Sequence, residues 1–183
     1  MYQRIEMKNI FLFLCFAALT SVVTAQRTPD PLSEGDMFPN AKFRTIDRKA
    51  LKTEELNGKV VMYNFYFAQC PPCIAEMEGL NELYHIFGAN DSVVFISVTF
   101  DDYATIDRYK KTYGLPFHIV SLDRNMLKRF VAGYPTNYLV DADGKIVMKR
   151  RGGVIDPTIA TKKVLHDFSP AIRKELQRAR AKE

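Results

Sequence analysis

Apolar runs and helical spacings alternate along this chain, and they predict strands and helices in turn. Residues 59–67 read Lys-Val-Val-Met-Tyr-Asn-Phe-Tyr-Phe, a nearly unbroken apolar run that is typical of a strand buried on both faces of a sheet. Residues 93–98 form a second run of this kind. Between the two runs, apolar residues recur at helical spacing up to a glycine, at Met77, Leu80, Tyr84, Phe87 and Gly88. The pattern therefore predicts a strand, a helix and a strand, which form a right-handed parallel crossover.

The second half of the chain continues this alternation. The predicted elements are a helix capped by Asp101 or Asp102 and ending at Gly114, a strand over 117–120, a short helix over 123–131, two strands over 136–140 and 145–149, and a final helix from Asp156 and Pro157 toward Phe168. The two late strands flank Asp141-Ala142-Asp143-Gly144, which is a hairpin signal. Together these elements predict an α/β fold, with a central mixed β-sheet flanked by helices on both faces.

The first 25 residues have the composition of a secretory signal peptide. Arg4 and Lys8 precede an apolar run over residues 10–23, and small residues lead to a cleavage site after Ala25. The run is shorter than the roughly 20 apolar residues of a membrane-spanning helix. An uncleaved leader that anchors the protein in the membrane is the alternative that the sequence leaves open. Either reading predicts an exported, periplasmic protein.

The remaining chain has the length and hydrophobic content of one soluble globular domain. We divide the sequence into a signal peptide (1–25), a linker rich in Pro, Asp and Ser (26–36), a folded domain (37–168) and a basic C-terminal helical tail (169–183).

The formal net charge of +5 at pH 7 is mild and is carried partly by this tail. We interpret the tail as a solvated helix, with contact to an acidic lipid or partner surface as the alternative. Residues 149–151, Lys-Arg-Arg, are interpreted as a solvent-exposed strand end. No basic patch is interleaved with aromatic residues, so we expect no nucleic-acid partner.

Two cysteines carry the strongest chemical signal. Cys70 and Cys73 are the only cysteines outside the leader, in the sequence Cys70-Pro71-Pro72-Cys73. Exported proteins usually use cysteines to join distant segments, which so close a pair cannot do. We therefore expect a redox-active disulfide, with no further cofactor. A static bridge is one alternative, and zinc is another, but zinc would need two more ligands and the three histidines show no ligand-like spacing.

The position of this pair, where a strand turns into a helix, favours thiol chemistry. Cys70 would lie at the N-terminal edge of the helix, where unpaired backbone N–H groups and the helix dipole stabilise a thiolate, the form that attacks disulfides. Cys73 would lie one turn inside and less exposed, where it can resolve the mixed disulfide that Cys70 forms. Pro71 and Pro72 stiffen the turn between them. We expect Cys70 to be accessible to clients.

These residues carry a resemblance to a known family. Residues 59–83, with Phe65-Tyr66-Phe67-Ala68-Gln69-Cys70-Pro71-Pro72-Cys73 at their centre, together with Tyr134-Pro135-Thr136 and Leu139 to Gly144, resemble exported thioredoxin-like proteins of the TlpA/ResA type, AhpC/TSA-like redoxins of the thioredoxin superfamily. The resemblance covers nearly all of residues 35–153. It implies a thioredoxin-like fold and a thiol–disulfide oxidoreductase.

The same resemblance implies partners. They would be exported client proteins with cysteines or disulfides, such as cytochrome c apoprotein or proteins with metal-site cysteines. The role would be a reducing one, with electrons supplied by a membrane partner.

The resemblance also assigns roles around the cysteines. Pro135 would follow a cis peptide bond and face the pair, leaving the backbone of Tyr134 free to bind an extended client segment. Glu76 matches an acidic residue that serves as proton acceptor for the buried thiol, with a solvated helix glutamate as the alternative. Asn64 stands where cytosolic thioredoxins carry a buried acid, and an amide does not titrate.

Two positions depart from the family pattern. Gln69 replaces the usual tryptophan, which makes the surface beside Cys70 more polar and so alters the expected contacts with the client. The resemblance implies that Gln69, Pro71 and Pro72 contact the client. Glu78 replaces a helix-kinking proline, so we expect a straighter helix.

Two function classes remain at this point. The first is an exported thiol–disulfide oxidoreductase that reduces disulfides in other exported proteins. The second is a non-catalytic binding module that presents the Pro135 edge to a partner while the cysteines form an inert bridge. A peroxidase is a weaker third reading, because a peroxidatic site would have Thr or Ser in place of Cys70.

Overall fold

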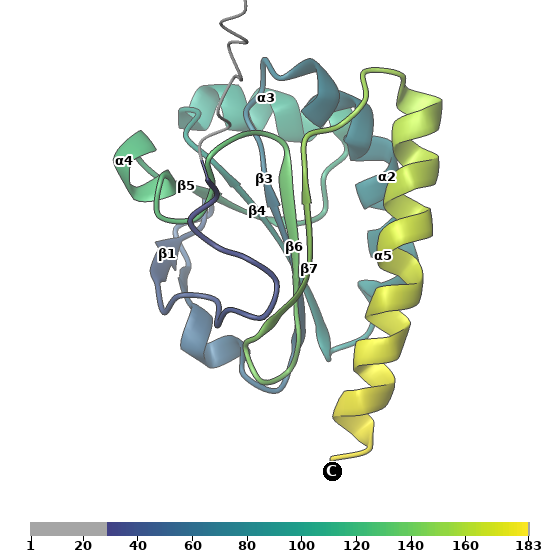
Figure 1. The fold of residues 1–183 in the computed structure, drawn as a ribbon. Coiled ribbons are helices and arrows are strands. Elements are labelled where there is room, and N and C mark those ends of the chain that lie inside the picture. Colours follow the sequence, from purple (N-terminus) through teal and green to yellow (C-terminus); the bar gives the residue numbers. More distant parts are fainter. Residues whose placement is uncertain (1–28, 183) are drawn as a thin grey trace, which may run out of the picture.

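The structure, a computed structural model, describes residues 29–182, so the predicted signal peptide lies outside the described residues. Its centre is a sheet with the strand order β5-β4-β3-β6-β7 (Figure 1). The strands are β3 (Val60–Phe65), β4 (Val93–Thr99), β5 (His118–Ser121), β6 (Thr136–Val140) and β7 (Ile146–Arg151). β3 pairs in parallel with β4, and β4 with β5, whereas β6 is antiparallel to both β3 and β7. The predicted mixed sheet is confirmed.

Helices cover both faces of this sheet. The helices are α2 (Pro71–Phe87), α3 (Tyr103–Tyr113), α4 (Arg124–Leu127), α5 (Pro157–Arg180) and a 3-10 helix, η1 (Thr53–Leu56), and a small hairpin joins β1 (Lys42–Arg44) to β2 (Ala50–Lys52). Side chains from α2, α3 and α5 pack on one face, and α4 with the N-terminal segment packs on the other. Alternate residues of β3 are buried in the two hydrophobic cores, one on each face of the sheet, because successive side chains of a strand point to opposite faces.

Local signals set several element ends. The Asp102 side chain accepts a hydrogen bond from the Thr105 backbone N–H at 2.7 Å and so caps α3, as one of the two predicted caps. Gly114 ends this helix in the left-handed region, at φ 62°, which suits glycine. α4 is shorter than predicted, because the chain leaves the helix at Lys128 and turns toward Phe130.

The C-terminal tail is part of the domain, which corrects the boundary we drew after residue 168. α5 continues without a break to Arg180 and lies along α2 (Figure 1). Ile172 and Leu176 are buried in the same core as Phe168. The reason is that apolar residues continue at helical spacing past residue 168, on the face opposite the basic side chains.

α2 and α5 approach closely at one glycine. A Cβ atom on Gly79 would lie 3.0 Å from both the Thr161 Cα and the Val164 Cβ, which is closer than most real Cβ contacts and would push the two helices apart by a few tenths of an ångström. Glycine at this position therefore lets the helix that begins at the cysteines pack directly on the C-terminal helix.

The predicted linker is also part of the domain from residue 29 onward. Gly35 donates its backbone N–H to the carbonyl of Ile146 at 2.8 Å, and Ile146 donates to the carbonyl of Asp36 at 2.9 Å. Leu32 is buried, 8 % exposed, in the core under α4. The segment is thus held along β7 by backbone hydrogen bonds and by an apolar anchor.

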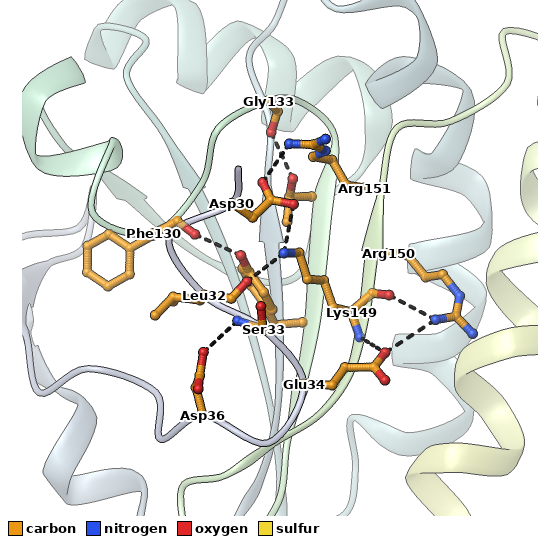
Figure 2. Close-up of polar contacts among 12 residues, drawn as sticks. Asp30, Leu32, Ser33, Glu34, Asp36, Phe130, Gly133, Lys149, Arg150 and Arg151 are labelled. Atoms are coloured by element: carbon orange, nitrogen blue, oxygen red, sulfur yellow. Dashed lines mark hydrogen bonds and ion pairs between the residues drawn. The ribbon is translucent and has the colours of Figure 1, made fainter. Parts of the chain in front are cut away.

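The basic residues 149–151 hold this segment and are not a free strand end, which corrects our expectation. Asp30 lies between two cations, with its carboxylate 2.7 Å from Lys149 Nζ and 2.8 Å from Arg151 Nη1 (Figure 2). Arg150 forms an ion pair with Asp167 of α5 at 2.9 Å. Lys149 and Arg151 lie more than a hundred residues from Asp30 in sequence, so no local sequence pattern predicts these two ion pairs.

Among residues 29–182, no helix has the length and apolar composition that crossing a membrane requires.

Candidate active site

Cys70 and Cys73 form a disulfide at the N-terminus of α2. Cys70 is the N-cap residue in an extended conformation, and its Sγ accepts a hydrogen bond from the Cys73 backbone N–H at 3.3 Å. Pro71 is the first helical residue, where its missing N–H costs nothing. The pair therefore lies at the strand-to-helix turn after β3, where the apolar and helical patterns place it.

The disulfide is more buried than the sequence suggests. Cys70 is 3 % exposed and Cys73 is 0 % exposed, since both belong to the core that α2 shares with the sheet. The order of exposure matches the prediction, but the accessible part of Cys70 is small. The neighbouring residues Gln69 and Pro71 are exposed.

Pro135 follows a cis peptide bond with Tyr134, as the resemblance implies. Pro135 is buried, and Tyr134 and Pro72 are half-buried. A Cβ atom built on Gly153 would lie 3.3 Å from both Pro135 Cγ and Pro72 Cβ, so these two prolines meet at one point of the β7–α5 loop. The cis-proline loop and the cysteine turn therefore approach each other at Gly153.

Glu76 lies at the same place. Its Oε1 would be 2.9 Å from a Cβ on Gly153, and its side chain is 7 % exposed. It is therefore not the solvated helix residue of the alternative interpretation. Glu76, three residues after Cys73 in α2, points its carboxyl group inward, toward Gly153 and near Pro72 and Pro135.

A buried chain of hydrogen bonds supports this carboxyl group, and it joins four residues: Glu76, Asn137, Asn64 and Ser97. Asn137 donates its side-chain amide to Glu76 Oε2 at 2.9 Å, and Asn64 donates to Asn137 Oδ1 at 2.8 Å. Ser97 donates its hydroxyl to Asn64 Oδ1 at 3.5 Å. The three polar residues of the sheet lie directly opposite one another on adjacent strands. A fixed amide network thus holds the carboxyl group in the core.

Burial raises the pKa of Glu76 to about 7, although the hydrogen bond from Asn137 and the charge of Lys163 act in the opposite direction. A carboxyl group with a pKa in this range exchanges protons near neutral pH, which an ordinary glutamate does not. The site therefore combines a disulfide with a group that can take up or release one proton.

Sequence reasoning missed Asn137 and Gly153. Asn137 interrupts an apolar strand in the way that Asn64 does, and the same signal applied to residues 136–140 would have found it. Gly153 shows no such signal, because its role depends on an approach between segments distant in sequence. Glu78 is exposed and α2 continues through it to Phe87.

Within residues 29–182, no cluster of three or more His, Cys, Asp or Glu side chains has the arrangement of a metal site.

Comparisons with known proteins agree with this geometry. The model of the AhpC/TSA family matches residues 35–149. The thiol-disulfide oxidoreductase ResA of Geobacillus thermodenitrificans is 28 % identical over 149 residues, which cover 79 % of this chain and 85 % of the relative. The thiol-disulfide oxidoreductase ResA of Bacillus thuringiensis subsp. konkukian is 30 % identical over 148 residues, 78 % of this chain and 84 % of the relative.

Solved structures show the same fold. A protein from Bacteroides thetaiotaomicron has a TM-score of 0.70 at 21 % identity, covering 80 % of this chain and 91 % of its own. A thiol:disulfide interchange protein of the thioredoxin family from Chlorobium tepidum has a TM-score of 0.63 at 19 % identity, covering 79 % and 99 %. The thioredoxin-like fold is confirmed by these likenesses.

Proposed function

The chain belongs to the AhpC/TSA family and is a thiol–disulfide oxidoreductase, and from this premise we propose that it is exported and reduces disulfides in other exported proteins through Cys70 and Cys73. The observation that carries the proposal is the Cys70–Cys73 disulfide at the N-terminus of α2, facing the cis-proline loop. The signal-like composition of residues 1–25 supports export.

The reaction begins from the reduced pair. The Cys70 thiolate attacks one sulfur of a client disulfide, so that a Cys70–client bond forms and the client's S–S bond breaks. The first client sulfur leaves as a thiolate and takes up a proton. The Cys73 thiol then loses its proton and attacks the Cys70 Sγ, which releases the second client sulfur, so that the client leaves as a dithiol. Two electrons pass to the client, and the pair returns to the disulfide seen in the structure. A membrane-bound dithiol donor would reduce it again.

Glu76 would accept the Cys73 proton in the second step. Its carboxyl group is buried beside the cysteine turn, and its pKa of about 7 suits proton transfer near neutral pH. Asn137, through its hydrogen bond, would fix the orientation of this carboxyl group.

The same carboxyl group supports a reducing direction. A disulfide is strongly oxidising when its surroundings stabilise the thiolate of the reduced pair. A buried carboxylate beside the pair has the opposite effect, because like charges disfavour each other. We therefore expect the disulfide to be the more stable form, which makes the dithiol a good reductant.

The cis-proline loop would supply client binding. The backbone of Tyr134 would pair with an extended client segment, and main-chain pairing of this kind accepts many sequences. Gln69, Pro71 and Pro72 would border the bound segment on the side of the cysteines.

The test is a trapping experiment in the exporting cell. Cys73→Ser should accumulate mixed disulfides between Cys70 and client proteins, and the matched variant Cys70→Ser should accumulate none. Recovery of the same partners from a variant without both sulfurs would show an inert binding module instead. Equilibration of the purified pair with a glutathione series should give a reduction potential close to the roughly −270 mV of thioredoxin, and a value near the roughly −120 mV of a strong oxidase would refute the reducing direction.

A further inference from the structure

An open cavity lies beside the cis-proline loop, and the roles described above do not use it. Its volume is about 460 Å³, which is within the roughly 300–1,000 Å³ of ligand sites. Its lining includes Pro29, Phe100, Arg124, Lys128, Val131 and Tyr134. The cavity therefore has apolar and aromatic walls and two cationic side chains.

Aromatic packing connects this cavity to the disulfide. The Tyr134 ring contacts the rings of Phe100 and Phe67, with centroids 5.8 Å and 5.4 Å away. The Phe67 carbonyl accepts a hydrogen bond from the Cys70 backbone N–H at 3.1 Å. A polypeptide paired with the Tyr134 backbone and bonded to Cys70 would thus run past the cavity, at about 3.3 Å per residue.

The two cations of the cavity are available for an anion. The Arg124 guanidinium lies 3.9 Å from the centre of the Phe100 ring, and Lys128 Nζ donates to Asn125 Oδ1 at 3.3 Å. Both side chains are exposed, and among residues 29–182 neither has an acidic partner within ion-pair distance.

The two acidic residues next to the lining residues Phe100 and Arg124 in sequence, Asp101 and Asp123, accept hydrogen bonds from other groups. Asp101 Oδ2 accepts hydrogen bonds from the Ala68 backbone N–H and the Thr99 hydroxyl, both at 2.7 Å. Asp123 Oδ1 accepts hydrogen bonds from the Asn125 and Met126 backbone N–H groups at 2.9 Å and 3.0 Å. Within residues 29–182, neither of these carboxylates forms an ion pair with Arg124 or Lys128.

We propose that this cavity binds the carboxylate side chain of an Asp or Glu in the client, a few residues from the cysteine that Cys70 attacks. The inference rests on the function proposed above and names its client class. The planar guanidinium of Arg124 offers paired donors that match a carboxylate, and it is held in place by the Phe100 ring. The Tyr134 and Val131 side chains pack against the methylene groups of the client's Asp or Glu.

The test uses two peptides that differ only in charge. Each carries one cysteine as a 2-pyridyl mixed disulfide, with either Glu or Gln at the three positions on both sides. Reduced full-length protein attacks the peptide sulfur, which breaks the bond to the neutral 2-thiopyridone leaving group. Cys73 then releases the peptide thiol and the protein is oxidised. Absorbance of the released 2-thiopyridone gives the second-order rate constant.

We expect the Glu peptide to react about 3- to 10-fold faster than the Gln peptide, as two partly exposed ion pairs allow. The double variant Arg124→Gln/Lys128→Gln should abolish the preference and leave the Gln peptide unaffected. Lys42→Gln/Lys174→Gln removes the same net charge from exposed positions outside the cavity and should keep the preference. The preference should also shrink in high salt.

Equal rates for the two peptides with the unmodified protein would overturn the proposal. Persistence of the preference in the Arg124→Gln/Lys128→Gln variant would also overturn it, because the charge recognition would then lie elsewhere. If the unmodified protein reacts with neither peptide, the oxidoreductase function of the pair fails and the subsite falls with it. Both variants change exposed side chains, so their folding is checked directly by thermal unfolding.

Discussion

Glu76 provides a prediction in which one side chain controls the pH dependence of stability. Its carboxyl group is 7 % exposed, and burial raises its pKa from 4.5 to about 7. Between these two pH values the folded protein binds more protons than the unfolded chain. Stability therefore falls as pH rises through this window, and the penalty is complete above pH 7.

The magnitude follows from the pKa. Each tenfold change in the ionisation constant corresponds to about 1.4 kcal/mol, so the ionised carboxylate costs the folded state about 3 kcal/mol at pH 8 and almost nothing at pH 4. Glu76→Gln imitates the neutral acid and can still accept the hydrogen bond from Asn137. The stability advantage of this variant over the unmodified protein should therefore grow by about 3 kcal/mol between pH 4 and pH 8.

The measurement is urea unfolding of the oxidised protein, with the disulfide intact so that no thiol titrates. Glu82→Gln, at an exposed position of the same helix, is the matched control against which the gain of Glu76→Gln is measured. A difference for Glu76→Gln that does not change with pH would refute the reasoning, since the buried carboxyl group would then have the same pKa in the folded and unfolded states.

Two further changes test the corrected domain boundaries. Asp30→Asn should lower the free energy of unfolding by about 2 kcal/mol at pH 7, because it removes the negative charge that faces both Lys149 and Arg151. Burial tends to raise the pKa of Asp30, but the two cations hold it below its ordinary value of 3.8. In urea titrations the cost of the substitution should therefore decline as the pH falls below about 4 and disappear once the pH has passed the lowered pKa of the folded protein. A cost that stays constant below about pH 4 would contradict the ion-pair account. Ile172→Ala should cost about 3 kcal/mol and exposed Lys174→Ala less than about 0.5 kcal/mol by thermal unfolding, and equal costs would place the end of α5 outside the cooperative unit.

The sheet and its helices were predictable because their signals are local. The buried strand at 60–65, the cap at Asp102 and the hairpin at 141–144 each depend on a few neighbouring residues. The strand-to-helix position of the cysteines followed from the same patterns. Physical reasoning from periodicity and turn chemistry was sufficient for these features.

The remaining features depend on contacts between distant segments. Asn137 gains its role only because β6 is in register with β3, which brings it opposite Asn64. Asp30 becomes a structural residue only when β7 lies beside it. The prediction that the domain ends at residue 168 was wrong for a related reason. The end of α5 is basic in composition, and its apolar residues Ile172 and Leu176 gain a role only where they pack in the core shared with α2. Local composition does not encode such partners.

Gly153 limits how this enzyme could be modified. A Cβ there would lie 2.9 Å from the Glu76 carboxyl oxygen and 3.3 Å from Pro135 Cγ and Pro72 Cβ, so a side chain at this position would displace the acid and press on both prolines. Arg124 and Lys128 are exposed to solvent, where exchange of a side chain costs the folded protein little. Engineering or divergence of selectivity would therefore begin at these two residues, whereas a side chain at Gly153 would disturb the carboxyl group that the proposed reaction uses.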